Sequence, residues 1–349
     1  VDYNGPETVA VAADAVTVPF AVTPIDDDNY EGNETLNVTV TSGTGYELDS
    51  TVTVNVTVIE DDYPSGTVIF ADNFDTDSSA QWTVNAHDGN NASATFAEDY
   101  STTGYVPPYK PGATTKGLVF RANLAASLDR NAISASPTGL NVSGDFRMRF
   151  KAWNNYNGPL NGGGSGSTYH LAAGVGTTGD HAQFQFGSAD GIWFEMNGDG
   201  ASTQLIGDTS AYAGPVVLPA EYEVYAAPGT VDAVDRPRSS SNPYYSIWGG
   251  IQAPEEQVAQ YSQQAGTSVV GSFGASWHTV VIGYETNTVY WMIDGILIAS
   301  VPDSYSPLGP NVFVGWVDNF INTATSFPNP APMSFGIIDD LRIETVAAA

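Results

Sequence analysis

Two clusters of acidic residues border two neighbouring stretches of alternating sequence near the start of the chain. Residues 26–31 read DDDNYE, just ahead of ETLNVTV, and residues 59–62 read IEDD, directly after VTVNVTV. Calcium takes six to eight oxygen ligands, and carboxylates on adjacent loops supply such a set. Carboxylates crowded together without a cation repel one another, and some take up protons. The pattern is consistent with either a bound divalent cation or a solvated acidic rim.

These acids meet only if the two alternating stretches pair with each other. Both ETLNVTVT and TVTVNVTVIE alternate polar and apolar residues, which is typical of half-buried strands. The segment between them, SGTGYELDS, is rich in the residues that form turns and loops. We therefore expect an antiparallel pair whose acidic flanks lie at the same end.

The composition excludes several classes of partner. The chain has 349 residues, with 39 Asp and Glu against 10 Lys and Arg, a net charge of −29. Nucleic acids and anionic membrane surfaces are bound through Lys and Arg, so neither is expected as a partner. The absence of cysteine excludes disulfides, thiolate catalysis and Cys-ligated zinc. No apolar run is long enough to span a membrane, and we expect an extracellular or cell-surface part of a longer protein.

A domain boundary is predicted at DDYPSG, residues 61–66, where a proline ends a strand and a glycine follows. Residues 1–63 then form one domain and residues 66–346 a second. In the second, strand signals recur every ten to fifteen residues, which predicts an all-β fold. The best helical candidate is residues 253–266, with an early proline, two glutamates and a final glycine.

The stretch from residue 14 to residue 62 resembles the second half of a Calx-β domain, an immunoglobulin-like sandwich. The acidic cluster, the ETL strand, the loop with Tyr and Leu, the second strand and the final acids carry the resemblance. It implies that the acidic loops bind Ca2+ and that upstream strands of the family are missing here. The implied ligands are Asp27, Asp28, Glu31, Glu60, Asp61 and Asp62.

Three later segments resemble the concanavalin A-like lectin/glucanase superfamily, near its laminin G-like branch. They are DNFDTDSSAQWTVN from residue 72, SWHTVVIGYETNTVYWMIDGILIASVP from residue 276, and FGIIDDLRIE from residue 335. The resemblance implies a jelly roll of two antiparallel sheets, with glycan binding as a common function. It also implies structural calcium between the first and last strands, unless Asp340 faces solvent or pairs with Arg342. The implied ligands are Asp72, Asp75, Asp339 and Asp340.

Two segments combine aromatic residues with Asn, Ser and Gly, as sugar sites do. They are KAWNNYNGPLNGGGSGSTYH and RSSSNPYYSIWGG. The aromatic rings would stack on sugar rings, although packing in a sandwich core explains each aromatic residue as well. The candidates are Trp153, Tyr156, Tyr244, Tyr245 and Trp248.

Catalytic signals are weak. Glycoside hydrolysis needs two carboxylates, and the glucanase branch carries them as Glu-x-Asp-x-x-Glu on one strand. Neither Glu195 with Asp199 nor Glu221 with Glu223 matches that signature. No Gly-x-Ser-x-Gly motif and no metal-binding His spacing occurs, and His278 is expected at a rim rather than in a catalytic role.

Three functions remain after these exclusions. The first is a non-catalytic, calcium-stabilised module of a larger surface protein, used for adhesion or carbohydrate recognition. The second is a subunit of a surface filament or layer, in which a neighbouring copy donates a β-strand to the incomplete first domain. The third is a polysaccharide hydrolase or lyase with an unfamiliar site. The expected partners are therefore a glycan or further copies of the same chain.

Overall fold

The chain divides into two compact units, Val1–Ser65 and Gly66–Ala349. The structure, a computed structural model, describes residues 3–5, 9, 22–24, 34–40, 45, 52–58, 66–102, 105–122, 130–156, 158–161, 169–198, 209–218, 247–268, 270–319 and 333–346. Within these ranges, no helix has the length and apolar character needed to cross a membrane.

The first unit contains two small sheets. Strands β1 (Tyr3–Asn4) and β2 (Thr23–Pro24) pair with each other, and β3 (Glu34–Val40) pairs with β4 (Val52–Val58). The second pair is antiparallel with Glu34 opposite Val58, which confirms the expected strand pairing. The described strands form two separate pairs and not the immunoglobulin-like sandwich that the Calx-β resemblance implies. The acids of residues 26–31 and 60–62 lie outside the described residues.

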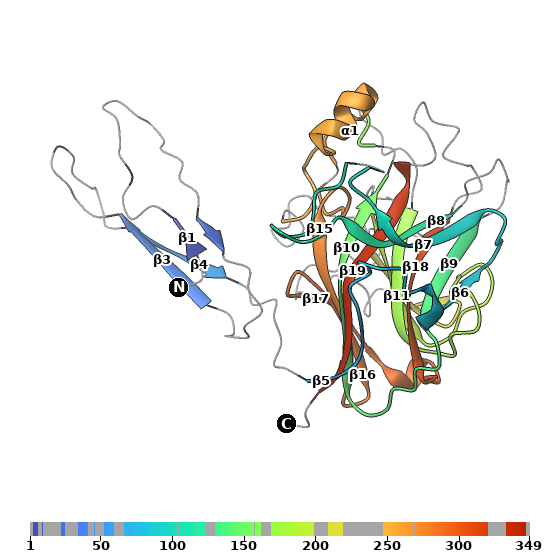
Figure 1. Cartoon of the computed structure of the whole chain (residues 1–349). Helices are drawn as coiled ribbons and strands as arrows, with labels where there is room; N and C mark the ends of the chain where they lie inside the picture. Colours follow the sequence, from blue (N-terminus) through green and yellow to red (C-terminus); the bar gives the residue numbers. More distant parts are fainter. Residues whose placement is uncertain are drawn as a thin grey trace. The chain divides into compact units, whose positions relative to one another are not determined.

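The strands of the second unit form two antiparallel sheets, so the prediction of an all-β sandwich is confirmed for this unit (Figure 1). One sheet contains β5 (Thr67–Asp72), β7 (Ala92–Asp99), β8 (Lys116–Ala122), β10 (Phe146–Asn155), β15 (Trp277–Glu285), β16 (Thr288–Ile293), β17 (Ile296–Pro302) and β19 (Phe335–Thr345). The other contains β6 (Trp82–Ala86), β9 (Asn131–Pro137), β11 (Tyr169–Thr177), β12 (Ile192–Asn197), β13 (Thr209–Ala213), β14 (Val216–Val217) and β18 (Asn311–Asp318).

The order of the strands brings distant parts of the chain together. In the first sheet it is β17-β16-β15-β10-β19-β8-β7, with β5 also paired to β19, and in the second it is β14-β13-β12-β11-β18-β9-β6. We call these the eight-stranded and the seven-stranded sheet. The first and last strands of the unit, β5 and β19, therefore lie side by side, as the sequence predicts. Short helices complete the unit: α1 (Glu255–Gln260), inside the expected helical segment, and the 3-10 helices η1 (Ser79–Gln81), η3 (Ser262–Gln264) and η4 (Asp303–Tyr305).

Period-two alternation builds the core between the two sheets. On β10, Phe146, Met148 and Phe150 are buried in this core, and the pleat directs the intervening Arg147 and Arg149 to the other face. Two hairpins join β15, β16 and β17. Each turns through two residues with positive φ, as the Asp294–Gly295 dipeptide predicts (50° and 72°).

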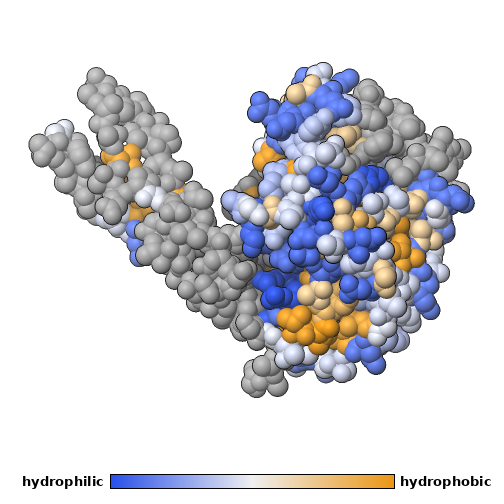
Figure 2. All heavy atoms as spheres, viewed as in Figure 1, coloured by the Kyte–Doolittle hydropathy of each residue, from blue (hydrophilic) through white to orange (hydrophobic). Residues whose placement is uncertain are grey.

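The seven-stranded sheet is buried on both faces. All nine residues of β11 and all eight of β18 are buried, although only alternate ones reach the core between the sheets. A second apolar cluster covers the outer face. It contains Ala132, Ala172, Phe184, Trp193, Tyr212, Phe313 and Val317. Figure 2 shows that the described surface of the unit is mostly hydrophilic on the side in view, with hydrophobic patches between.

A buried ion pair joins β10 to β19. Arg147 and Glu344 are register partners, and Arg147 Nε lies 2.6 Å from Glu344 Oε1 with both side chains almost fully buried. Breaking a buried pair leaves a charge in a medium of low dielectric constant. We expect Glu344→Gln to lower the free energy of unfolding by about 3 kcal/mol in urea titrations. The matched control is Glu98→Gln, because Glu98 pairs with Arg121 in a more exposed position. If both variants lose the same free energy of unfolding, burial does not make the Arg147–Glu344 pair the more important one.

Candidate functional site

The outer face of the seven-stranded sheet carries a row of polar side chains. On β12, Ile192, Phe194 and Met196 enter the core between the sheets. The pleat therefore directs Glu195 and Asn197 to the opposite face. The register then places Glu195 opposite Ala172 and Ser210, and Asn197 opposite His170.

Five of these side chains form one hydrogen-bonded cluster, which we call the Glu195 cluster. Glu195 Oε2 lies 2.7 Å from His170 Nδ1, and it accepts hydrogen bonds from the Tyr212 hydroxyl at 2.9 Å and from Asn319 Nδ2 at 3.3 Å. Asn197 Nδ2 donates to His170 Nε2 at 2.9 Å, which assigns the proton of a neutral imidazole to Nδ1. All five residues are at most 2 % exposed.

The cluster has acceptors that the described protein does not satisfy. Glu195 Oε1 and Asn319 Oδ1 are buried without a hydrogen-bond partner among the residues that the structure describes, and so is Ser210 Oγ. An unsatisfied buried polar group costs about 1–3 kcal/mol. Each of these three atoms can therefore accept a further hydrogen bond.

Aromatic rings lie beside the cluster. The rings of Trp193 and Tyr212 stack with centroids 4.1 Å apart, and Phe313 meets Trp193 edge to face. The Trp193 indole donates to the carbonyl of Gly214 at 2.8 Å, which holds its ring in place. Phe184, from the segment between β11 and β12, belongs to the same apolar cluster. The polar groups are thus bordered by rigid apolar surface.

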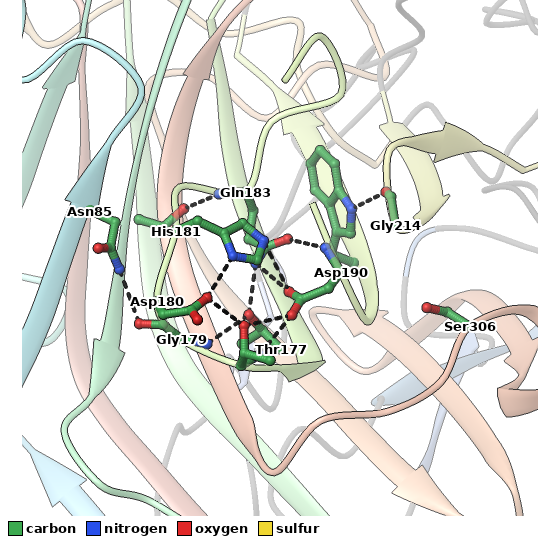
Figure 3. A network of polar contacts seen from close by, with 12 residues as sticks. Asn85, Thr177, Gly179, Asp180, His181, Gln183, Asp190, Gly214 and Ser306 are labelled. Atoms are coloured by element: carbon green, nitrogen blue, oxygen red, sulfur yellow. Dashed lines mark hydrogen bonds and ion pairs between the residues drawn. The ribbon is translucent and has the colours of Figure 1, made fainter. Parts of the chain in front are cut away.

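A second polar network fixes the segment that carries Phe184. Figure 3 shows His181 between Asp180 and Asp190, with Nδ1 2.7 Å from the former and Nε2 3.5 Å from the latter. The Gln183 amide donates to Asp190 Oδ1 at 2.7 Å, and the Thr178 amide to Oδ2 at 2.8 Å. Burial opposes ionisation of Asp190, but these hydrogen bonds hold its pKa below the usual range. The network stabilises the loop and, through it, the apolar cover of the sheet.

The Glu195 cluster suits binding better than hydrolysis. It offers acceptors, amide donors and an imidazole, which together match the hydroxyl groups of a polyol. It contains one carboxylate, whereas the usual glycosidase mechanism needs two. Asp199, Glu221 and Glu223 lie outside the described residues.

The predicted calcium ligands of the second unit are arranged as hydrogen-bond acceptors. Asp72 accepts from the Phe74 amide at 2.9 Å, from the Ser78 hydroxyl at 2.5 Å and from the Trp82 indole at 2.7 Å. Asp75 accepts from Asn73 Nδ2 at 2.6 Å and from the Thr114 hydroxyl.

The remaining two calcium candidates lie on β19. Asp340 has a left-handed backbone with φ of 44°, and its amide donates to Asp339 Oδ1 at 2.8 Å. Burial, with the charges of Asp340 and Asp75, raises the pKa of Asp339 to about 8. Within the described ranges, no three His, Cys, Asp or Glu side chains lie close enough together to hold a metal ion.

The aromatic residues predicted to bind sugar are packed inside the protein. Trp153 and Tyr156 are 3 % and 2 % exposed, and the Trp153 ring lies 5.7 Å from that of Trp277. Trp248 is 5 % exposed and packs 5.0 Å from Phe273. None of the three presents a ring face to solvent, so packing is the role that the structure shows for them. Tyr244 and Tyr245 lie outside the described residues.

Sequence reasoning missed His170, Tyr212 and Asn319 as partners of Glu195. Twenty-five positions separate His170 from Glu195, and Asn319 follows much later in the chain. The alternation of β12 marks Glu195 as pointing away from the core. No local pattern, however, shows that this outer face is buried or which strands adjoin it.

No protein-family model matches the chain, and no curated protein does. Similar solved structures include the Ca2+-bound VIP36 exoplasmic/lumenal domain, with a TM-score of 0.39 and 8% identity over 79% of this chain and 89% of that chain. Another is the endo-beta-1,4-glucuronan lyase from the fungus Trichoderma reesei, with a TM-score of 0.38 and 10% identity over 80% and 96%. A third is a galectin-like protein of unknown function from Bacillus subtilis, with a TM-score of 0.37 and 10% identity over 81% and 98%.

The raised pKa of Asp339 predicts a pH dependence of stability. An unfolded Asp titrates near pH 4, so between about pH 4 and about pH 8 the folded protein binds the extra proton. The contribution of this group to the free energy of unfolding is full below that window and falls as the pH rises through it. We expect Asp339→Asn to remove the decline, so that the variant melts higher than the parent at pH 8.5 in EDTA but not at pH 4. If the melting temperatures of parent and variant change with pH in parallel, this prediction is wrong.

Proposed function

We propose that the second unit is a carbohydrate-recognition module whose sugar site is the Glu195 cluster. The observation that carries the proposal is the pair of buried acceptors without a partner among the described residues, Glu195 Oε1 and Asn319 Oδ1. Sugar hydroxyls donate to such acceptors, and they accept from amide donors. The hydroxyl of Ser210, opposite Glu195 on β13, adds a third group.

Charge favours a neutral ligand. The chain has a net charge of −29, and the Glu195 cluster contains a carboxylate and no Lys or Arg. A phosphorylated or sulfated ligand would meet repulsion on approach and find no cation in the cluster. A neutral glycan meets neither obstacle. The stacked rings of Trp193 and Tyr212, which are almost fully buried, hold the polar groups in place.

The wider setting of the module follows from composition. The high acidic content, the absence of cysteine and the two-unit organisation support an extracellular adhesion or recognition module of a larger surface protein. Exposed valines support the alternative of a filament built by strand donation. On β4, Val54 and Val56 are 53 % and 45 % exposed, and the two-stranded β3–β4 sheet leaves an unpaired edge on each strand among the described residues.

An enzyme is the second candidate for the Glu195 cluster. The imidazole of His170 and the hydroxyl of Tyr212 contact the same carboxylate oxygen, so acid and base groups lie within reach of one point. Polysaccharide cleavage at this point would use Glu195 or His170 to move a proton.

Glycan binding tests the proposal directly. Glu195→Gln replaces an acceptor oxygen by a donor at nearly constant shape, so we expect at least tenfold weaker binding by calorimetry of a glycan found on an array. Glu98→Gln, which changes a carboxylate on the eight-stranded sheet, should bind like the parent. Equal affinity of Glu195→Gln and parent would overturn the site. Release of reducing ends or unsaturated products, lost in Glu195→Gln, would favour the enzyme.

Calcium stabilisation is proposed only for the acidic segments of the first unit. Among the described ligand candidates of the second unit, Asp72, Asp75 and Asp339 already accept hydrogen bonds from the protein. We therefore expect calcium to raise a melting temperature of the full chain relative to EDTA, and Asp61→Asn to reduce that shift. Asp75→Asn is the matched control and should keep the shift. If Asp75→Asn loses the calcium-dependent rise in melting temperature, the ion binds in the second unit. If the parent shows no such rise, calcium does not stabilise the chain.

A further inference from the structure

A serine, a histidine and an aspartate form a relay at the start of β15. Ser276 Oγ lies 2.8 Å from His278 Nε2, and His278 Nδ1 lies 2.7 Å from Asp294 Oδ2. In this order the imidazole accepts the hydroxyl proton on one nitrogen and donates to a carboxylate with the other, which is the arrangement that activates a serine nucleophile. The three residues are separate from the hydrogen bonds of the Glu195 cluster.

The carboxylate of this relay is firmly held. Asp294 Oδ1 accepts the Thr279 amide at 2.8 Å, and Oδ2 accepts the Trp248 indole at 2.9 Å as well as His278. Burial alone would raise the pKa of Asp294, but the imidazole and these donors keep it below the usual range. Phe273 packs against the His278 ring edge to face at 5.4 Å. The imidazole is therefore fixed in orientation and in tautomer.

The serine is the member of the relay positioned for attack. His278 is 4 % exposed, whereas Ser276 is partly exposed. The preceding residue, Ala275, has φ of 62°, a left-handed conformation that costs a non-glycine residue about 1–2 kcal/mol. The amide of Ala275 donates to the carbonyl of Asn154 at 3.0 Å, which anchors the strained position to the end of β10. Strain of this kind is common at functional sites and sets the direction of the next side chain.

We infer that Ser276, His278 and Asp294 form a hydrolytic site for short-chain carboxylic esters of a neutral alcohol. Ser276 Oγ bonds to the ester carbonyl carbon while its proton moves to His278 Nε2. The bond to the alcohol oxygen then breaks, and that oxygen takes the proton. Water attacks the acyl-serine, gives a proton to His278, and releases the carboxylic acid as Oγ regains its proton. Asp294 is a positioning residue that stabilises the imidazolium.

Charge sets the substrate class. An acyl donor with phosphate or carboxylate groups would be repelled by a chain of net charge −29. A neutral ester is not repelled, and a short acyl group suits a serine that is only partly exposed. The inference is independent of glycan binding, because it uses different side chains.

The full chain tests the inference with p-nitrophenyl acetate and a fluorophosphonate probe. We expect ester hydrolysis above that of buffer, and probe attachment at Ser276 located by mass spectrometry. Ser276→Ala should lower the rate at least about a hundredfold and abolish labelling. The matched control is Ser262→Ala, because Ser262 is exposed and follows α1 at the start of η3.

A second variant separates a relay from a serine that is merely reactive. Asp294→Asn keeps the positive φ of the turn, since Asn tolerates that conformation. It should slow hydrolysis and probe attachment together, with a changed pH profile, because the imidazole loses its anionic partner. Labelling of the parent stands as a readout even where a variant does not fold. The inference is overturned if the parent neither hydrolyses the ester nor carries the probe on Ser276, or if Ser276→Ala retains the parent's rate.

Discussion

Burial of the seven-stranded sheet on both faces is the constraint on which the rest of the unit depends. An antiparallel sheet commonly leaves one face to water, yet all nine residues of β11 are buried. Polar side chains on the outer face must then be satisfied by neighbours on adjacent strands rather than by solvent. Glu195 Oε2 is satisfied by His170, Tyr212 and Asn319, which come from three other segments. Glu195 Oε1 has no hydrogen-bond partner among the described residues.

Because Lys and Arg are scarce, other groups donate hydrogen bonds to most of the buried carboxylates. With 10 Lys and Arg for 39 acids, most carboxylates have no basic partner available. Asp72 is satisfied by a hydroxyl, an amide and an indole, and Asp294 by an imidazole, an amide and an indole. Glu344 is one of the few that keeps a guanidinium. A histidine that is hydrogen-bonded to a buried carboxylate has a fixed tautomer. The same imidazole is then suited to proton transfer.

Local pattern predicted the strands and missed the sites for a definite reason. Alternation and turn residues locate β15, β16 and the Asp294–Gly295 turn, because both signals act within a few residues. The face on which Ser276 and His278 sit also follows from their spacing of two. His278, expected at a rim, is buried at the start of β15. Phe273 packs against its ring edge to face, and Trp248 packs against Phe273. That packing joins segments that the sequence separates by Gly-rich connections, and no periodicity encodes it.

The tie between the first and last strands is made by their backbone. Register pairing runs from Thr67 opposite Thr345 to Asp72 opposite Leu341, so backbone hydrogen bonds already close the unit. At the end of this ladder, Asp72 receives the Trp82 indole from the other sheet. A cation bound to that carboxylate would have to displace the indole, the Ser78 hydroxyl or the Phe74 amide, and each displaced buried donor costs about 1–3 kcal/mol. Through these hydrogen bonds Asp72 links the two sheets.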